Sequence, residues 1–233
     1  MALVTKKILI PDLPDIISDM GQVREILHQH RIAIDQLSSH IPMTFKTLQV
    51  GEDSNYMEVL SDGEIRLHGT ARTTNHVRVS AGSFKPGNQA PTEAFLGVFP
   101  ILQYAAATDD EAHYSVEVPY RMEPGTEIVP VLNWTYQGAQ DNGTVCWKIE
   151  FIFVAAGETV DGTTATLTET TAGSHATGKK IDTTFSPAMT GGVAEDLAGI
   201  RVWRDTSGDT LAVAADFLEL HLHFIRDRLG EAT

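Results

Sequence analysis

Acidic side chains outnumber basic ones by 31 to 17 over 233 residues, which gives a formal net charge of −14. Such a surface repels nucleic acid, and the single cysteine, Cys146, excludes an intramolecular disulfide framework and suits a reducing cytosol. We recognise no leader peptide and no run of about eighteen apolar residues, so we expect no membrane and no nucleic-acid partner.

Residues 1–14, MALVTKKILIPDLP, are predicted to form an anchoring arm. The apolar run is too short to fold alone, so we expect it to need a partner surface. The arm residues expected to anchor the chain to a capsid are Lys6, Lys7, Ile8, Leu9 and Ile10.

Residues 1–50 carry five basic and five acidic side chains, so the remaining residues hold the whole net charge. This asymmetry indicates either a neutral anchor with a charged body that faces water, or simply an acidic surface that favours solubility.

Residues 15–42 are predicted to form a coiled-coil helix. Its stripe runs in steps of four and three residues over nearly four heptads: Ile16, Met20, Val23, Leu27, His30, Ile34, Leu37 and Ile41. β-Branched residues at d positions disfavour a parallel dimer, so we interpret the stripe as the seam of a homotrimer. The alternative is a helix packed on its own domain, because Ile17, Ile26 and Ile32 lie off the stripe. His30 is interpreted as a polar layer that fixes register, with a ring of imidazoles around an ion as the alternative.

The rest of the chain is predicted to be almost wholly β. NYMEVLSDGEIRLHG, within residues 43–75, predicts a β-hairpin connector with its turn at Ser61 to Gly63. Later strands are expected near 76–80, 96–104, 113–118, 126–136, 144–154, 164–169, 179–185, 199–204 and 211–226. The predicted fold class is therefore mainly β: an antiparallel jelly-roll β-sandwich over residues 76–233, preceded by an N-terminal trimeric coiled-coil helix and a β-hairpin.

The segment LELHLHFIRD raises the question of a metal site. In a strand, Glu219, His221 and His223 share one face. The two histidines alone cannot complete a site, and a third ligand would have to come from another strand. No nucleotide-binding, nucleophile-elbow or zinc motif is present, and Cys146 is interpreted as an inert thiol. We therefore predict no catalytic residues, no metal ligands and no cofactor.

Several strand sequences resemble a group of tailed-bacteriophage virion proteins with a jelly-roll domain, of the head-decoration or head-fibre kind. They are NYMEVLSDGEIRLHGTA, YRMEPGTEIVPVLNWTY, CWKIEF, IRVWRDTSGD and FLELHLHFIRDRLGE. Relatives often carry His-x-His before the Trp, where this chain has Val131, Leu132 and Asn133. The resemblance covers about residues 55–230 and implies a structural component without catalysis.

Two hypotheses follow. The first is a non-enzymatic, trimeric capsid decoration protein on the outer surface of the virion, attached through its N-terminal region to the major capsid protein or another virion protein. The alternative is a receptor- or carbohydrate-binding module of a phage tail or fibre, with a groove lined by Trp134, Trp147 or Trp203. A cupin-like metalloenzyme that uses His221 and His223 is a weaker third option.

Overall fold

The computed structural model describes residues 28–29, 47–52, 54–60, 63–70, 72–138, 143–173 and 177–229. The chain divides into two compact units, Met1–Phe45 and Lys46–Thr233. Of the first unit only His28 and Gln29 are described, both helical. The predicted anchoring arm (residues 1–14) and the eight residues of the predicted trimer seam lie outside the described residues. Among the described residues, no helix is long and apolar enough to cross a membrane.

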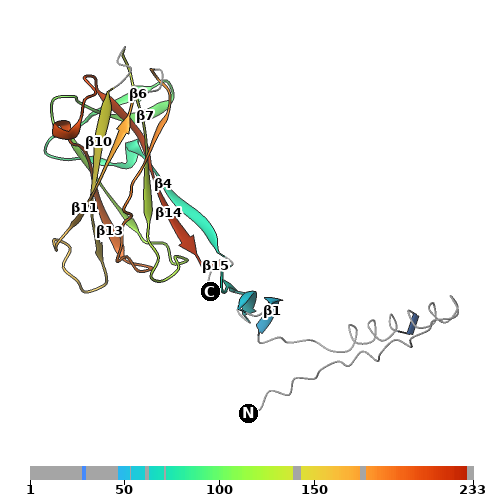
Figure 1. Ribbon diagram of the computed structural model, residues 1–233. Helices are drawn as coiled ribbons and strands as arrows, with labels where there is room; N and C mark the ends of the chain where they lie inside the picture. The colour runs from blue at the N-terminus through green and yellow to red at the C-terminus, as the bar shows by residue number, and fades with distance from the viewer. Residues whose placement is uncertain are drawn as a thin grey trace. The chain divides into compact units, whose positions relative to one another are not determined.

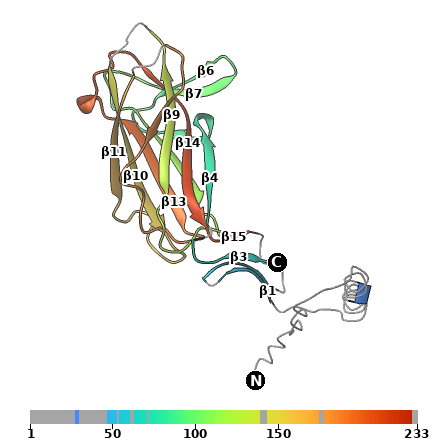
Figure 2. The same cartoon turned by 45° about the vertical axis from the view of Figure 1, so that its right-hand side comes forward.

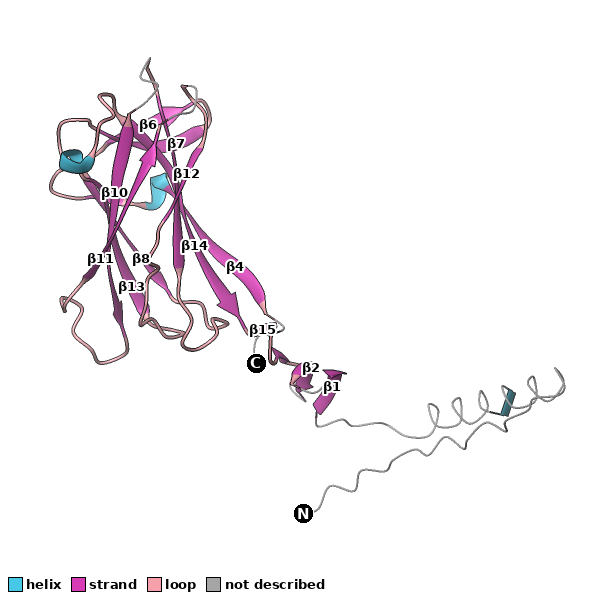
Figure 3. Cartoon of the chain, in the orientation of Figure 1, coloured by secondary structure: helices cyan, strands magenta, loops and turns pink. Residues whose placement is uncertain are grey.

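The second unit is mainly β, and its strands pair antiparallel (Figures 1 and 3). One large sheet has the order β11-β10-β13-β8-β5. Its strands are β5 (Lys85–Pro86), β8 (Glu111–Glu117), β10 (Thr144–Val154), β11 (Ala165–Ala172) and β13 (Leu197–Arg204). Short 3-10 turns at Ala81–Ser83 (η1) and Thr206–Gly208 (η2) connect neighbouring elements.

The other large sheet has the order β12-β9-β14-β7-β6, with β4 also paired to β14. Its strands are β4 (Thr73–Ser80), β6 (Thr92–Leu96), β7 (Phe99–Tyr104), β9 (Val129–Tyr136), β12 (Ile181–Thr184) and β14 (Ala215–Arg226). Figure 2 shows β9, β14 and β4 side by side. β4 pairs with the C-terminal part of β14 and with no other described strand, so it is an edge strand.

The two large sheets pack on one another through alternating apolar residues. Trp134 of β9 and Trp147 of β10, both fully buried, have ring centroids 6.2 Å apart across the two sheets. Phe217 of β14 also lies against Trp147, at 6.5 Å. Along β10, Val145, Trp147, Ile149 and Phe151 alternate and are all buried, as a strand with one face on the core requires. One hydrophobic core therefore lies between the sheets.

Two details of the β body differ from the sequence prediction. The strand expected at 96–104 is a hairpin of β6 and β7, because Gly97 adopts a φ of 62° and turns the chain. The predicted hairpin of β2 (Asn55–Leu60) and β3 (Ile65–Leu67) is confirmed, but it belongs to a four-stranded sheet. That sheet has the order β1-β2-β3-β15 and adds β1 (Thr47–Glu52) and β15 (Arg228–Leu229). Residues from the end of the chain therefore pair with the connector.

Candidate functional site

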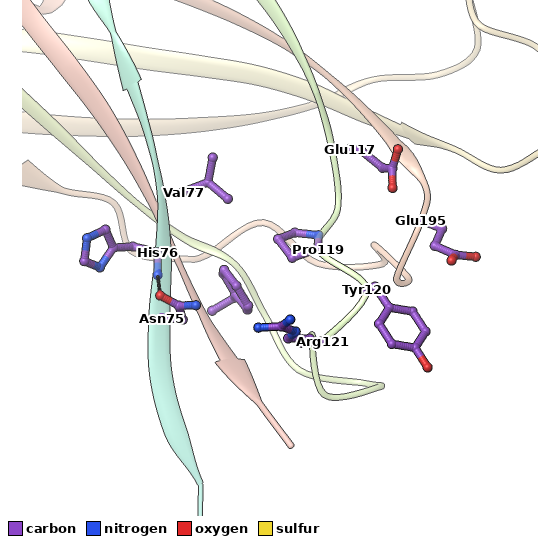
Figure 4. Close-up of a pocket in the computed structure, with 9 residues that line it drawn as sticks. Asn75, His76, Val77, Glu117, Pro119, Tyr120, Arg121 and Glu195 are labelled. Atoms are coloured by element: carbon purple, nitrogen blue, oxygen red, sulfur yellow. Dashed lines mark hydrogen bonds between the residues drawn. The ribbon is translucent and has the colours of Figure 1, made fainter. Parts of the chain in front are cut away.

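A cleft lies where β4 and β8 leave the edge of the sandwich open. Its volume is about 610 Å³. Figure 4 shows the residues that line it: Asn75, His76, Val77, Glu117, Pro119, Tyr120, Arg121, Glu195 and Phe224. They come from β4, from the end of β8 with the loop that follows, from the turn before β13, and from β14.

The cleft exists because the two edge strands belong to different sheets. β8 pairs with β13 along its whole length, but on its other side β5 covers only Ala112 and His113. The end of β8 thus has no second partner among the described strands, and it faces β4 of the opposite sheet. Val77 and Phe224, at the margin of the core, consequently line the cleft.

The floor of the cleft is apolar. Phe224 of β14 is buried, with 3% of its surface exposed, and Val77 of β4 lies beside it. A separate apolar pocket of only about 10 Å³ shares Val77 and Phe224 with the cleft, and Ile128, Met189 and Leu222 of the core also line it. A ligand in the cleft would therefore rest on the hydrophobic core.

The rim of the cleft is polar. Glu117 and Glu195 are exposed, whereas Tyr120 and Arg121 are half-buried. On β4, Asn75 accepts a hydrogen bond from the backbone N–H of His76 at 2.9 Å (Figure 4). The His76 ring lies on the opposite side of β4 from Val77, as alternation along a strand requires. The rim thus combines carboxylate, amide, guanidinium and phenol groups.

Glu195 has a left-handed backbone conformation, with a φ of 73°. This conformation costs an ordinary residue roughly 1–2 kcal/mol, and such outliers are found at functional sites. Two backbone hydrogen bonds hold it: Glu195 N–H donates to Val118 C=O at 2.9 Å, and Val118 N–H donates to Asp196 C=O at 2.8 Å. The turn is therefore fixed to the end of β8, with the Glu195 carboxylate at the rim.

The loop that carries Tyr120 and Arg121 is fixed to the sheet on the other side. Glu123, close behind them, forms an ion pair of 2.6 Å with Arg72, and its N–H donates to Ile225 C=O at 2.8 Å. The hydrogen bond from Arg72 to Glu123 raises the pKa of the guanidinium above its ordinary value. Met122, buried at 2% exposed, also bridges to Arg226. The wall of the cleft is thus held by contacts to β14.

The tryptophans proposed from the sequence do not form this site. Trp134 and Trp147 are fully buried in the core, so their assignment to a groove is wrong. Trp203 is half-buried on the outer face of the other sheet, where the Arg201 guanidinium lies 4.4 Å from its ring centroid. Tyr120 and Glu195 were not predicted as site residues because they lie in loops. They come close to β4 only through the pairing of strands, which the periodicity of the sequence does not show.

The structure places His221 and His223 on the outer face of β14, as expected, and it brings His76 of β4 to them. This third histidine was not foreseen. The described residues contain no group of three or more His, Cys, Asp or Glu side chains that could hold a metal ion. Leu218 of the same strand is half-buried, and the register of β14 shifts between Phe217 and Glu219.

Comparisons with protein families and with curated proteins find no match. Among solved structures, the chain is similar to a Paenibacillus sp. cycloisomaltooligosaccharide glucanotransferase complexed with cycloisomaltoheptaose. The TM-score is 0.43 and the identity 14%, over 63% of this chain and 18% of the enzyme. It is also similar to an Arthrobacter globiformis T6 isomalto-dextranase complexed with panose, with TM-score 0.44 and 14% identity over 68% of this chain and 24% of the enzyme.

A third similar structure is TmCBM61 in complex with β-1,4-galactotriose. Its TM-score is 0.28 and its identity 14%, over 64% of this chain and 87% of the other. The chain spans less than a quarter of the length of each of the two enzymes. All three TM-scores lie below 0.5, so these likenesses assign neither a fold nor a ligand to this chain.

Proposed function

We propose that this chain is a non-enzymatic binding protein that takes up a carbohydrate of a receptor in the cleft between β4 and β8. The observation that carries the proposal is the combination of an apolar floor, an aromatic wall and a polar rim in one open cleft. Its volume of about 610 Å³ lies within the usual range for small-ligand sites.

The chemistry of the lining suits a sugar. A pyranose ring has apolar C–H faces, which pack on an aromatic ring such as Tyr120, and hydroxyl groups around its edge. Carboxylate oxygens of Glu117 and Glu195 accept hydrogen bonds from such hydroxyls, and the Arg121 guanidinium donates them. Asn75 offers both a donor and an acceptor. The lining therefore supplies both kinds of contact that recognition of a sugar needs.

Binding without hydrolysis is the simpler reading of the same residues. Cleavage of a glycosidic bond uses a carboxyl group that an apolar pocket keeps protonated, as general acid. Glu117 and Glu195 are both exposed to solvent. The apolar residues of the cleft, Phe224 and Val77, lie at its floor and do not enclose either carboxyl group. We therefore propose no catalytic residues.

The experiment is a screen of the purified full chain on an array of α- and β-linked gluco- and galacto-oligosaccharides. We expect binding that Tyr120→Ala abolishes. The matched control is Tyr56→Ala, which removes a half-buried tyrosine of β2 that stacks on His68, away from the cleft. Binding that survives Tyr120→Ala, or no binding to any oligosaccharide, would contradict the proposal.

We also propose that the sandwich is a jelly roll. The support is the strand order: β4-β14-β9-β12 run in one sheet and β8-β13-β10-β11 in the other. Strands that are neighbours in sequence mostly lie in opposite sheets, as two Greek keys require, and β5, β6 and β7 are insertions in this scheme.

The second candidate function is a trimeric capsid decoration protein on the virion surface. The observation that favours it is the division of the chain into a first unit that contains the heptad stripe and a second, β unit. In this proposal the first unit attaches to a capsid or other virion protein, and the β body faces water. Imaging of intact particles distinguishes density on the head from density on the tail.

A further inference from the structure

Three histidines from two paired strands gather on the outer face of the sheet. His223 of β14 lies opposite His76 of β4 in the register, and His221 lies opposite Arg78. The ring centroids are 5.3 Å apart for His76 and His223, 5.6 Å for His76 and His221, and 5.9 Å for His221 and His223. We call these three residues the histidine cluster.

The charged neighbours of the histidine cluster only partly compensate a positive charge. Arg78 Nε donates to His76 Nε2 at 2.7 Å, a bond that needs a free lone pair on that ring nitrogen. Protonation of His76 at Nε2 would break it and leave an imidazolium beside a guanidinium. Glu219 is the carboxylate in contact, with its Oε1 at 2.8 Å from His221 Nε2.

The other strand packed against β14 supplies no charge. Val131 and Val129 of β9 lie opposite His221 and His223, and Asn133 lies opposite Glu219. Glu127, just before β9, lines the same shallow groove as His223. The groups that face the histidine cluster are therefore Arg78, Glu219 and Glu127, and Arg78 opposes further protonation.

The position of His223 has an effect on stability. Burial, followed by the nearby His76, His221 and Arg78, lowers its pKa below the ordinary value. The folded state then binds fewer protons at this site than the unfolded state does. The contribution of His223 to the free energy of unfolding is fully present above its unfolded pKa, near 6.5. It is lost as the pH falls through the pKa of the folded state.

The histidine cluster is connected to the cleft by β4. Asn75 and Val77, which line the cleft, flank His76 on this strand. β4 is an edge strand held by β14 alone among the described strands, and His221 and His223 project from β14. A repulsion between the two strands therefore acts on the wall of the cleft.

We propose that the histidine cluster makes the cleft acid-sensitive: protonation loosens β4 from β14 and releases the bound carbohydrate. The part that concerns release rests on the proposed function. The loosening of β4 does not, and it is measured without ligand.

The first measurement is amide hydrogen exchange of the full chain at pH 7.5 and 5.0, corrected for the intrinsic effect of pH. We expect protection of β4 amides to fall roughly tenfold or more at pH 5.0, while β10 and β13 stay protected. The double variant His221→Gln, His223→Gln, which leaves the lining of the cleft unchanged, should keep its protection at both pH values. His113→Gln is the control, because His113 is an exposed histidine of the other sheet.

The second measurement is binding of the array-selected oligosaccharide at the same two pH values. We expect affinity to fall at pH 5.0 in the wild type and in His113→Gln, but not in the double variant. If β4 loosens in acid and no oligosaccharide binds at any pH, the proposed function fails while the loosening stands. Equal β4 protection at both pH values would overturn the inference. So would a rise in melting temperature with Zn²⁺ at pH 7.5 that the double variant loses, because the cluster would then be a metal site.

Discussion

Asp216 is a carboxylate buried on β14, with 1% of its surface exposed. Its Oδ1 accepts a hydrogen bond from Gln103 Nε2 at 2.9 Å, and its Oδ2 has no hydrogen-bond partner among the described residues. Burial raises the pKa of this carboxyl, and the bond from Gln103 opposes that rise only in part. Its contribution to stability is therefore present below the unfolded pKa, near 3.9, and is lost as the pH rises through the folded pKa.

We predict that Asp216→Asn stabilises the fold at pH 7, by roughly 1 kcal/mol, the usual size of a single-residue effect. The amide oxygen keeps the bond from Gln103 and the buried charge is removed. The advantage should shrink toward pH 4, where the wild-type carboxyl is increasingly protonated. Thermal unfolding at the two pH values measures this. A variant less stable than wild type at pH 7 would mean that Oδ2 has a partner that requires the charge.

Glu195 gives a prediction in which stability and binding change in opposite directions. Glycine adopts a φ near 73° without strain, so Glu195→Gly should stabilise the fold by about 0.5–1 kcal/mol, after its greater freedom in the unfolded chain is subtracted. The same change removes a carboxylate from the rim and should weaken oligosaccharide binding. Glu195→Gln is the control, because it keeps the strain and loses only the charge. A Glu195→Gly variant that binds as tightly as wild type would remove Glu195 from the site.

For single residues, the sequence predicted which face of its own strand a side chain occupies. It did not predict contacts between side chains of two different strands. The position of His221 and His223 on one face of β14 follows from period-two alternation along that strand. His76 could not be assigned to them, because its place beside β14 depends on pairing between strands far apart in sequence. The same holds for Tyr120 and Glu195.

Among the elements, most strands of the body could be located from alternation and turn residues. β10 lies at 144–154 as expected, and β9 and β14 begin three and four residues later than predicted. β6 was missed because Phe-Leu-Gly-Val-Phe reads as one apolar run unless the glycine is taken as a turn. β15 was missed because a two-residue strand carries no period.

The hairpin of β6 and β7 exposes a cluster of apolar side chains. Phe95, Val98 and Phe99 are 79%, 88% and 61% exposed. Since they bury little surface, the double variant Phe95→Ser, Val98→Ser should change the free energy of unfolding by less than about 0.5 kcal/mol. Chemical denaturation checks this, with Leu102→Ser on the buried face of β7 as a destabilised control. A loss of several kcal/mol in the double variant would show that the hairpin packs on a surface of the fold.

For the whole molecule, the trimer remains a proposal that rests on the heptad stripe, which lies outside the described residues. We predict that the full chain sediments as a trimer, and that His30→Ile raises the melting temperature of the assembly. An imidazole on a three-fold axis costs on the order of 1 kcal/mol per chain to desolvate, and isoleucine removes that cost. The wild-type trimer should also weaken below about pH 6.5, where imidazolium ions on one axis repel. A monomer at micromolar concentration would show that the helix packs on its own domain.

The central claim is that the cleft between β4 and β8 binds a carbohydrate, and amide chemical-shift mapping with the array-selected oligosaccharide tests it most directly. The account predicts saturable shifts at Asn75, Val77, Tyr120, Arg121 and Glu195, which Tyr120→Ala removes and Tyr56→Ala preserves. Shifts centred instead on Trp203 and Arg201, on the outer face of the other sheet, or no shifts with any oligosaccharide, would contradict it.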